Sequence, residues 1–187
     1  MNNAVVRVTA KEDRDAIVGL LAACPMFRPC EVAIGVEVLD EAVKSGPEGH
    51  YQSRTAFVED AVVGWICWGP TPCTEATYDI YWIVVAEPHR GHRIGGSMLS
   101  AAEQEIRERG GRLAVVETSA RSDYAATRKF YARHAYQQAA VVPDFYAPGD
   151  NKEIYVKPLQ GLIPVCAIAS APSLQPEVQA DDREKKA

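Results

Sequence analysis

The fold of this chain is decided by the apolar run IYWIVV at residues 80–85 and the turn RGHRIGG at residues 90–96. The apolar run predicts a buried strand, and the glycine-rich segment predicts a turn that leads into a helix. The first N–H groups of a helix have no intrahelical partner and lie at the positive end of its dipole. Arg90, His92 and Arg93 add donors and positive charge at the same point. We therefore predict an anion-binding site at this turn.

Two familiar phosphate-binding loops do not match the turn. A P-loop has Lys-Ser or Lys-Thr after its glycines, and no such pair follows Gly95 or Gly96. The dinucleotide pattern G-x-G-x-x-G is also absent, because the glycines of the turn stand at positions 91, 95 and 96. These differences argue against a nucleoside triphosphatase and against a nicotinamide-binding protein.

The turn resembles the coenzyme A loop of the GNAT N-acetyltransferase superfamily, whose pattern is Q/R-x-x-G-x-G/A. Arg90 fills the first position and Gly95 the last, while Arg93 stands where the pattern has glycine. Alone, this match also fits an ordinary strand–turn–helix corner. A second motif, FYARHAY at residues 130–136, resembles the F/L-Y-x-x-x-G-F motif of the same family, with Ala135 and Tyr136 in place of its last two residues. The resemblance covers about residues 5–158.

The order of predicted elements agrees with that family. We expect strands at 5–8, 54–59, 62–69, 77–85, 113–118, 136–142 and 152–156, and helices from a capping box at 9–12 to about 24, then at 31–44, 95–108 and 124–133. Residues 60–61 predict a tight turn, and residues 143–150 a loop. The resemblance implies the GNAT fold, an α/β fold (α+β in some schemes) with a mixed, mostly antiparallel twisted sheet and flanking helices. It also implies a splayed parallel strand pair, at 82–85 and 115–118.

Composition sets the remaining limits. With 187 residues we expect one domain at 1–159 and a C-terminal tail at 160–187 that is first apolar and then disordered. The net charge of -5 without a basic stripe argues against a nucleic-acid partner and suits an amine substrate. The chain has no membrane-spanning apolar run and no secretory signal, so we expect a cytoplasmic protein without a membrane partner. The five cysteines and four histidines show no metal-ligand spacing, so we predict no metal site.

The resemblance implies acetyl-CoA as co-substrate and direct transfer of its acetyl group in a ternary complex. A backbone N–H near Val84 or Val85 would stabilise the oxyanion. Tyr124 stands where the family commonly has a coenzyme-contacting asparagine. The predicted coenzyme-binding residues are Ile83, Val84, Val85, Arg90, Gly91, His92, Arg93, Ile94, Gly95, Gly96 and Tyr124.

Two residues are the predicted catalytic groups. Tyr131 matches the family's tyrosine beside the coenzyme sulfur, and a phenol with a pKa of about 10 can protonate a departing thiolate. Its alternative role is aromatic packing at the helix end. Glu117 corresponds to a carboxylate that some members use as general base, and its alternative role is a solvated or ion-paired strand residue. Glu75, Asp79 and Asp144 are rival bases, and ordered water could also relay the proton.

The acceptor is predicted to be the primary amine of a small molecule. Phe27, Tyr81, Glu117 and Tyr146 are the predicted acceptor-binding residues. Two alternatives stay open: an acetyltransferase for a protein N-terminus or lysine, and a non-catalytic module that binds acetyl-CoA. A protein acceptor needs an open groove, so a cleft closed by residues 143–150 would argue against it. The sequence also leaves a homodimer open.

Overall fold

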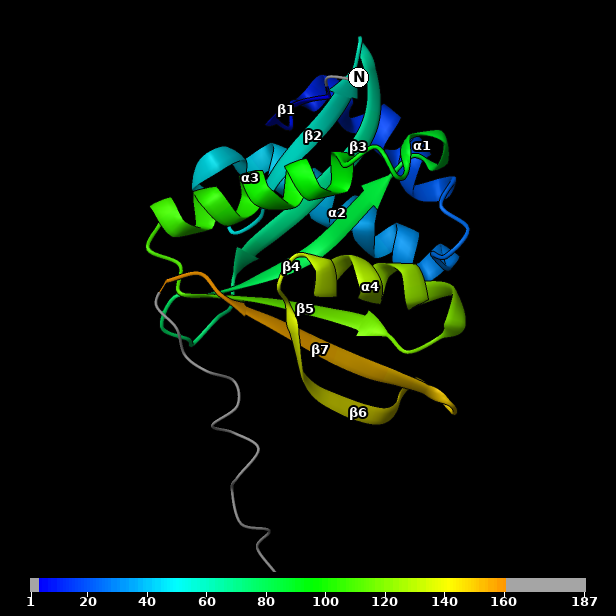
Figure 1. The fold of residues 1–187 in the computed structure, drawn as a ribbon. Helices are drawn as coiled ribbons and strands as arrows, with labels where there is room; N and C mark the ends of the chain where they lie inside the picture. Colours follow the sequence, from blue (N-terminus) through cyan, green and yellow to red (C-terminus); the bar gives the residue numbers. More distant parts are fainter. Residues whose placement is uncertain (1–3, 161–187) are drawn as a thin grey trace, which may run out of the picture.

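The structure is a computed structural model that describes residues 4–160 (Figure 1). The elements, in chain order, are β1 (Val5–Val8), α1 (Arg14–Ala22), α2 (Pro29–Ser45), β2 (Gln52–Val58), β3 (Ala61–Pro70), β4 (Thr77–Val85), α3 (Ile94–Glu108), β5 (Leu113–Ser119), α4 (Ala125–Arg133), β6 (Gln137–Ala147) and β7 (Asp150–Pro158). This order of strands and helices is the predicted one. Apart from Gln160, the predicted tail lies outside the described residues.

The strands form one seven-stranded sheet in the order β1-β2-β3-β4-β5-β7-β6. Neighbouring strands are antiparallel except for β4 and β5, which are parallel and joined through α3. The predicted mixed sheet with one parallel pair is therefore confirmed.

The centre of the sheet is buried on both faces because helices cover each side (Figure 1). Alternation along β3 divides its large side chains between two cores. Ile66 and Trp68 belong to the core under α3, whereas Trp65 and Cys67 belong to the core under α1 and α2. A strand with both faces covered reads as a continuous apolar run, which is what VVGWICW at residues 62–68 shows.

The parallel pair separates soon after it begins (Figure 1). β4 and β5 pair only from Thr77 with Leu113 to Asp79 with Val115, although both strands continue well beyond these residues. On its other side β4 has a bulge, because Cys67 pairs with Trp82 and Trp68 with Ile80. A bulge bends a strand and redirects its side chains. The rest of β4 therefore has a free edge toward β5.

Several predicted boundaries were wrong, and three of them have a clear structural cause. The capping contact expected at residues 9–12 lies one residue later, where the buried carboxylate of Asp13 accepts a hydrogen bond from the Ala10 amide at 2.8 Å. This contact begins a 3-10 turn (Lys11–Asp13), and α1 follows it from Arg14. The first hairpin turns at residues 59–60, since Val58 pairs with Ala61. The expected loop at 143–150 is mostly strand, because β6 continues to Ala147 despite Pro143. An edge strand tolerates proline, since its outer N–H groups need no partner.

Candidate active site

A cleft lies between β4 and β5 where the two strands diverge, and we call it the strand cleft. Its volume is about 620 Å³, and its walls come from β4, β5, α4, the β6–β7 hairpin, the connection between α1 and α2 and the first turns of α2. It brings together the residues that were predicted to be catalytic or to bind the acceptor: Glu117, Tyr131, Phe27, Tyr81 and Tyr146. The strand divergence therefore creates one space for both sets.

A second cleft of about 920 Å³ lies at the N-terminal end of α3, and we call it the helix cleft. Most of the predicted coenzyme-binding residues line it: Ile83, Val84, Val85, Arg90, Gly91, Arg93, Ile94, Gly95 and Gly96. Of the other two, His92 lines neither cleft and Tyr124 lines the strand cleft. Arg133 and His134 add basic side chains at the C-terminal end of α4. The helix N-terminus and these side chains favour an anionic ligand.

The two clefts meet at Met26, Ile83 and Thr127, which line both of them. These residues belong to the α1–α2 connection, β4 and α4 respectively. A ligand long enough to fill both clefts must pass this point. Its anionic end would lie at the start of α3 and its other end near Tyr131.

The turn before α3 depends on left-handed backbone. Gly91 has a φ of 81°, and Arg93, the residue that caps α3, has a φ of 64° and a ψ of 7°. Ala135, which replaces glycine in the second motif, has a φ of 66°. A side chain at such a position costs about 1–2 kcal/mol. Both residues that replace a glycine of the family motifs therefore lie where the backbone conformation favours glycine.

Gly95 and Gly96 have a packing role. A Cβ atom at Gly95 would lie 3.3 Å from the ring of Phe130, and one at Gly96 would lie 2.8 Å from Nε2 of His134. The absence of side chains at these positions lets α3 pack closely against α4 at the helix cleft. The glycines thus position the helix N-terminus.

Tyr131 is buried in the wall of the strand cleft, with 3% of its surface exposed. Its ring packs edge-on against Phe130, which lines the helix cleft, with the ring centres 5.2 Å apart. Burial raises the pKa of the Tyr131 phenol. The hydroxyl is therefore protonated at neutral pH and can act as a donor.

Glu117 lies at the strand cleft on β5 and forms an ion pair with Lys152 of β7, with 2.6 Å between Oε2 and Nζ. Its side chain is 45% exposed, so the carboxylate is open to solvent and to a ligand. The ion pair is the alternative that the sequence left open for this residue. The pair occupies Oε2, and Oε1 has no hydrogen-bond partner among the described residues.

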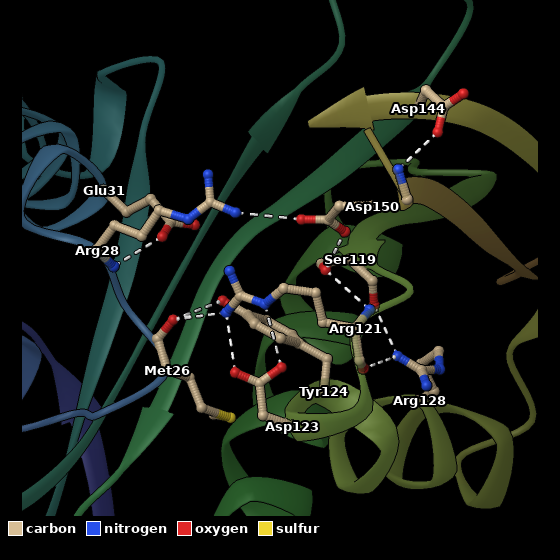
Figure 2. A network of polar contacts seen from close by, with 11 residues as sticks. Met26, Arg28, Glu31, Ser119, Arg121, Asp123, Tyr124, Arg128, Asp144 and Asp150 are labelled. Carbon is tan, nitrogen blue, oxygen red and sulfur yellow. Dashed lines mark hydrogen bonds and ion pairs between the residues drawn. The ribbon is translucent and has the colours of Figure 1, made fainter. Parts of the chain in front are cut away.

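The rival carboxylates occupy different places. Asp79 lines the strand cleft, where its Oδ2 accepts a hydrogen bond from Thr71 at 2.7 Å. Glu75 and Asp144 do not line either cleft. Asp144 instead accepts a hydrogen bond from the Gly149 amide at 2.7 Å and stabilises the turn between β6 and β7 (Figure 2). Asp79 is the rival base that is placed to reach a ligand.

The α1–α2 connection lies over the strand cleft and is held there by hydrogen bonds (Figure 2). The carbonyl of Met26 accepts bonds from Arg121 at 3.1 Å and from the Tyr124 hydroxyl at 3.4 Å. Burial is the main cause that raises the pKa of Tyr124 to about 12, so its hydroxyl remains a donor. Arg121 is held in turn by Asp123 at 3.0 Å. Met26 is thereby fixed at the point where the clefts meet.

Sequence reasoning missed the contact between Arg28 and Asp150 in the strand cleft, and it missed Ser119 as a residue of that cleft. Arg28 reaches across the cleft to Asp150, and Ser119 donates a hydrogen bond to the same carboxylate (Figure 2). Arg121 was missed as well. A polar residue such as Ser119, two positions after the predicted base on β5, was the one available signal. Arg28 and Asp150 are far apart in sequence and belong to no shared motif, so their pairing was not predictable.

Two further observations concern metal ions and membranes. Within residues 4–160, no group of three His, Cys, Asp or Glu side chains is arranged to hold a metal ion. None of the helices in that part of the chain is long and apolar enough to cross a membrane.

Comparisons with known proteins agree on one family. Residues 20–136 match the model of the acetyltransferase (GNAT) family. A GNAT-family protein from Desulfovibrio desulfuricans is similar with a TM-score of 0.80 and 34% identity, over 84% of this chain and 99% of its own. Curated proteins give no match.

Two more distant structures share the fold. The ribosomal-protein-S18-alanine N-acetyltransferase of Escherichia coli has a TM-score of 0.68 and 14% identity, over 85% of this chain and 96% of its own. An aminoglycoside 6'-N-acetyltransferase complexed with coenzyme A has a TM-score of 0.67 and 16% identity, over 84% of this chain and 98% of its own. Because one enzyme acts on a protein and the other on an aminoglycoside, the fold alone does not select between acceptors.

Proposed function

The chain belongs to the GNAT acetyltransferase family and is an acyltransferase, and we propose that it moves the acetyl group of acetyl-CoA to a primary amine of a small molecule. The observation that carries the proposal is the meeting of the two clefts at Ile83, beside the buried hydroxyl-bearing side chain of Tyr131. Transfer takes place directly between the two substrates at this point.

The helix cleft suits the coenzyme. Its N–H groups and positive dipole at the start of α3 would bind the pyrophosphate, and Arg90 and Arg93 would add side-chain charge. The free edge of β4 offers unpaired main-chain groups to the pantetheine arm, which has amides of its own. The coenzyme A complex of the related aminoglycoside enzyme supports this assignment.

The strand cleft supplies the groups that acetyl transfer needs. The amine must lose a proton, its nitrogen must attack the thioester carbonyl, and the carbon–sulfur bond must then break. Glu117, directly or through water, takes the proton from the amine. A main-chain N–H of Ile83–Val85 on the free edge of β4 stabilises the oxyanion. Tyr131 gives its proton to the departing thiolate, and the thiol that forms has a reference pKa of about 8.5.

A small acceptor is favoured by the covering of the strand cleft. The α1–α2 connection lies over it, and Tyr146 and Asp150 line it from the β6–β7 hairpin. A peptide substrate needs an extended open groove, which these contacts obstruct. Four carboxylates line the cleft against two arginines, and this balance suits an ammonium group: Glu31, Asp79, Glu117 and Asp150, with Arg28 and Arg121.

Turnover with a panel of acceptors tests the proposal. Coenzyme A release from acetyl-CoA is measured with small primary amines, amino acids, aminoglycosides and short peptides with free N-termini or lysines. We expect release that depends on at least one small amine and exceeds that with any peptide. Faster turnover of peptides would favour the protein-acceptor alternative. Tight acetyl-CoA binding by calorimetry without turnover of any amine would favour the binding module.

A further inference from the structure

Arg28 and Asp150 form a clasp that joins the two sides of the strand cleft (Figure 2). Arg28 is the last residue before α2, and Asp150 is the first residue of β7. Nη2 of Arg28 lies 3.2 Å from Oδ2 of Asp150. The Asp150 carboxylate is buried, with 6% of its side chain exposed, whereas the Arg28 side chain is 45% exposed. The clasp thus joins the α1–α2 connection, which we call the roof of the strand cleft, to the start of β7 on the opposite side.

The second oxygen of Asp150 supports the roof through Ser119 and Arg121. Oδ1 accepts a hydrogen bond from Ser119 Oγ at 2.5 Å, and the same Oγ accepts a bond from the Arg121 amide at 3.1 Å. Arg121 in turn binds the carbonyl of Met26 through its guanidinium. Both oxygens of one buried carboxylate therefore support the α1–α2 connection, one directly and one through Ser119.

The main chain of Arg28 is fixed independently of its side chain. Its amide donates a hydrogen bond to Oε2 of Glu31 at 2.7 Å, which caps the start of α2. Loss of the contact with Asp150 would therefore release the Arg28 side chain and loosen residues 24–28 without unfolding α2. Met26 would keep its bonds from Arg121 and Tyr124, so the junction with the helix cleft would change less.

We propose that Asp150 is a positioning residue that, through Arg28, holds the roof of the strand cleft in place over the acceptor and so sets acceptor affinity. The inference rests on the proposed function, because it assigns the acceptor to the strand cleft. Asp150 acts on binding and leaves the transfer step to Glu117 and Tyr131. Loss of the Asp150 carboxylate should therefore raise the KM for the acceptor and leave kcat nearly unchanged.

The test uses Asp150→Asn, which keeps the side-chain volume and an oxygen for Ser119 but removes the charge that faces Arg28. We expect the acceptor KM to rise about tenfold, as for the loss of one charge-assisted contact, with kcat and the acetyl-CoA KM within about twofold. Arg28→Met should give the same rise. The double variant should be no worse than either single variant, because both remove one interaction. An unchanged acceptor KM, additive effects, or a loss confined to kcat would overturn the proposal.

Hydrogen exchange of residues 24–28 gives a readout that needs no acceptor. Exchange in the free protein should be faster in Asp150→Asn and in Arg28→Met than in the parent protein. The matched control is Arg14→Met, which removes the exposed Arg14–Asp40 pair between α1 and α2, away from both clefts. It should change neither this exchange nor the acceptor KM. Equal exchange in all variants would overturn the clasp.

The two readouts separate this inference from the proposed function. If the parent protein turned over no amine, the proposed function would fail, and the exchange measurement would still decide whether the clasp holds the roof. If Asp150→Asn did not fold, Arg28→Met would carry both measurements, since the Arg28 side chain is half-exposed.

Discussion

The ring of Tyr131 lies edge-on against the ring of Tyr136, with 5.5 Å between the ring centres and 61° between their planes. Both tyrosines are buried, and only Tyr131 lines a cleft. The two residues share surroundings but differ in their access to a ligand. This relationship provides a matched pair of variants for the proposed acid.

Tyr131→Phe removes the hydroxyl and keeps the ring. We expect kcat to fall on the order of 100-fold, because a general acid contributes roughly 100- to 10,000-fold. The acetyl-CoA dissociation constant, measured by calorimetry, should change little. Tyr136→Phe should leave kcat within about threefold, since any loss there acts through packing. Equal kcat values for Tyr131→Phe and the parent protein would disprove the acid role.

Buried tyrosines predict a loss of stability at alkaline pH. Burial raises the pKa of Tyr131, and it raises the pKa of Tyr124 to about 12, above the unfolded value of about 10. A raised pKa means that the stabilisation is fully present below about pH 10 and is lost as the pH rises through the folded pKa. The free energy of unfolding should therefore decline from about pH 10 upward.

Urea unfolding at a series of pH values measures this decline. In Tyr131→Phe it should be shallower by up to about 1.4 kcal/mol per pH unit, the contribution of one proton. Tyrosinate absorbance should show that Tyr131 does not ionise in the folded protein near pH 10. A parallel decline in the parent protein and in Tyr131→Phe would refute the link.

Arg93→Gly should affect stability and coenzyme binding in opposite directions. Glycine relieves the left-handed strain at φ 64°, so the free energy of unfolding should rise by about 1 kcal/mol, less the entropy that glycine adds to the unfolded chain. Loss of the charge should weaken acetyl-CoA binding about tenfold. Thermal unfolding and calorimetry measure the two effects.

Ala135→Gly is the control for this pair of effects. It relieves similar strain at φ 66° without changing a charge, so it should stabilise the fold and leave acetyl-CoA binding unchanged. Arg93→Ala should weaken binding without stabilising the fold. If Arg93→Gly bound acetyl-CoA as tightly as the parent protein, Arg93 would have no role in coenzyme binding.

Glu117→Gln tests the general base. We expect kcat/KM for the amine to fall on the order of 100-fold near neutral pH, with a smaller deficit at alkaline pH, where more of the amine is already neutral. Glu75→Gln, at a carboxylate that lines neither cleft, should have no effect. Retention of most activity by Glu117→Gln would assign the proton to ordered water or to Asp79.

Local patterns predicted the fold because the pattern that indicates each helix or strand lies within consecutive residues. The strand IYWIVV and the turn RGHRIGG placed the parallel pair, and the turn correctly located the N-terminus of α3. Errors arose where tertiary contacts decide. Asp13 accepts a hydrogen bond from the Ala10 amide ahead of α1 and is bound by Arg7 from β1, and the edge position of β6 lets a strand continue through Pro143.

The candidate site was predictable only where a motif carried it. Tyr131 and the turn before α3 belong to short motifs, and Glu117 followed from the family resemblance of its strand. The structure places each of them at a cleft. The contact between Arg28 and Asp150 depends on how the sheet and the α1–α2 connection are arranged in the fold. No spacing in the sequence predicts it. The left-handed backbone at Arg93 was also not predicted, because arginine is not a residue type that indicates a positive φ.

Initial rates measured while both acetyl-CoA and the amine are varied show whether the acetyl group moves directly between the two substrates where the clefts meet. Transfer within a ternary complex predicts double-reciprocal lines that intersect, with no acetylated form of the protein in intact-mass spectra taken without amine. Parallel lines together with an acetylated protein would rule out direct transfer, because they would mean that the acetyl group first moves to the enzyme.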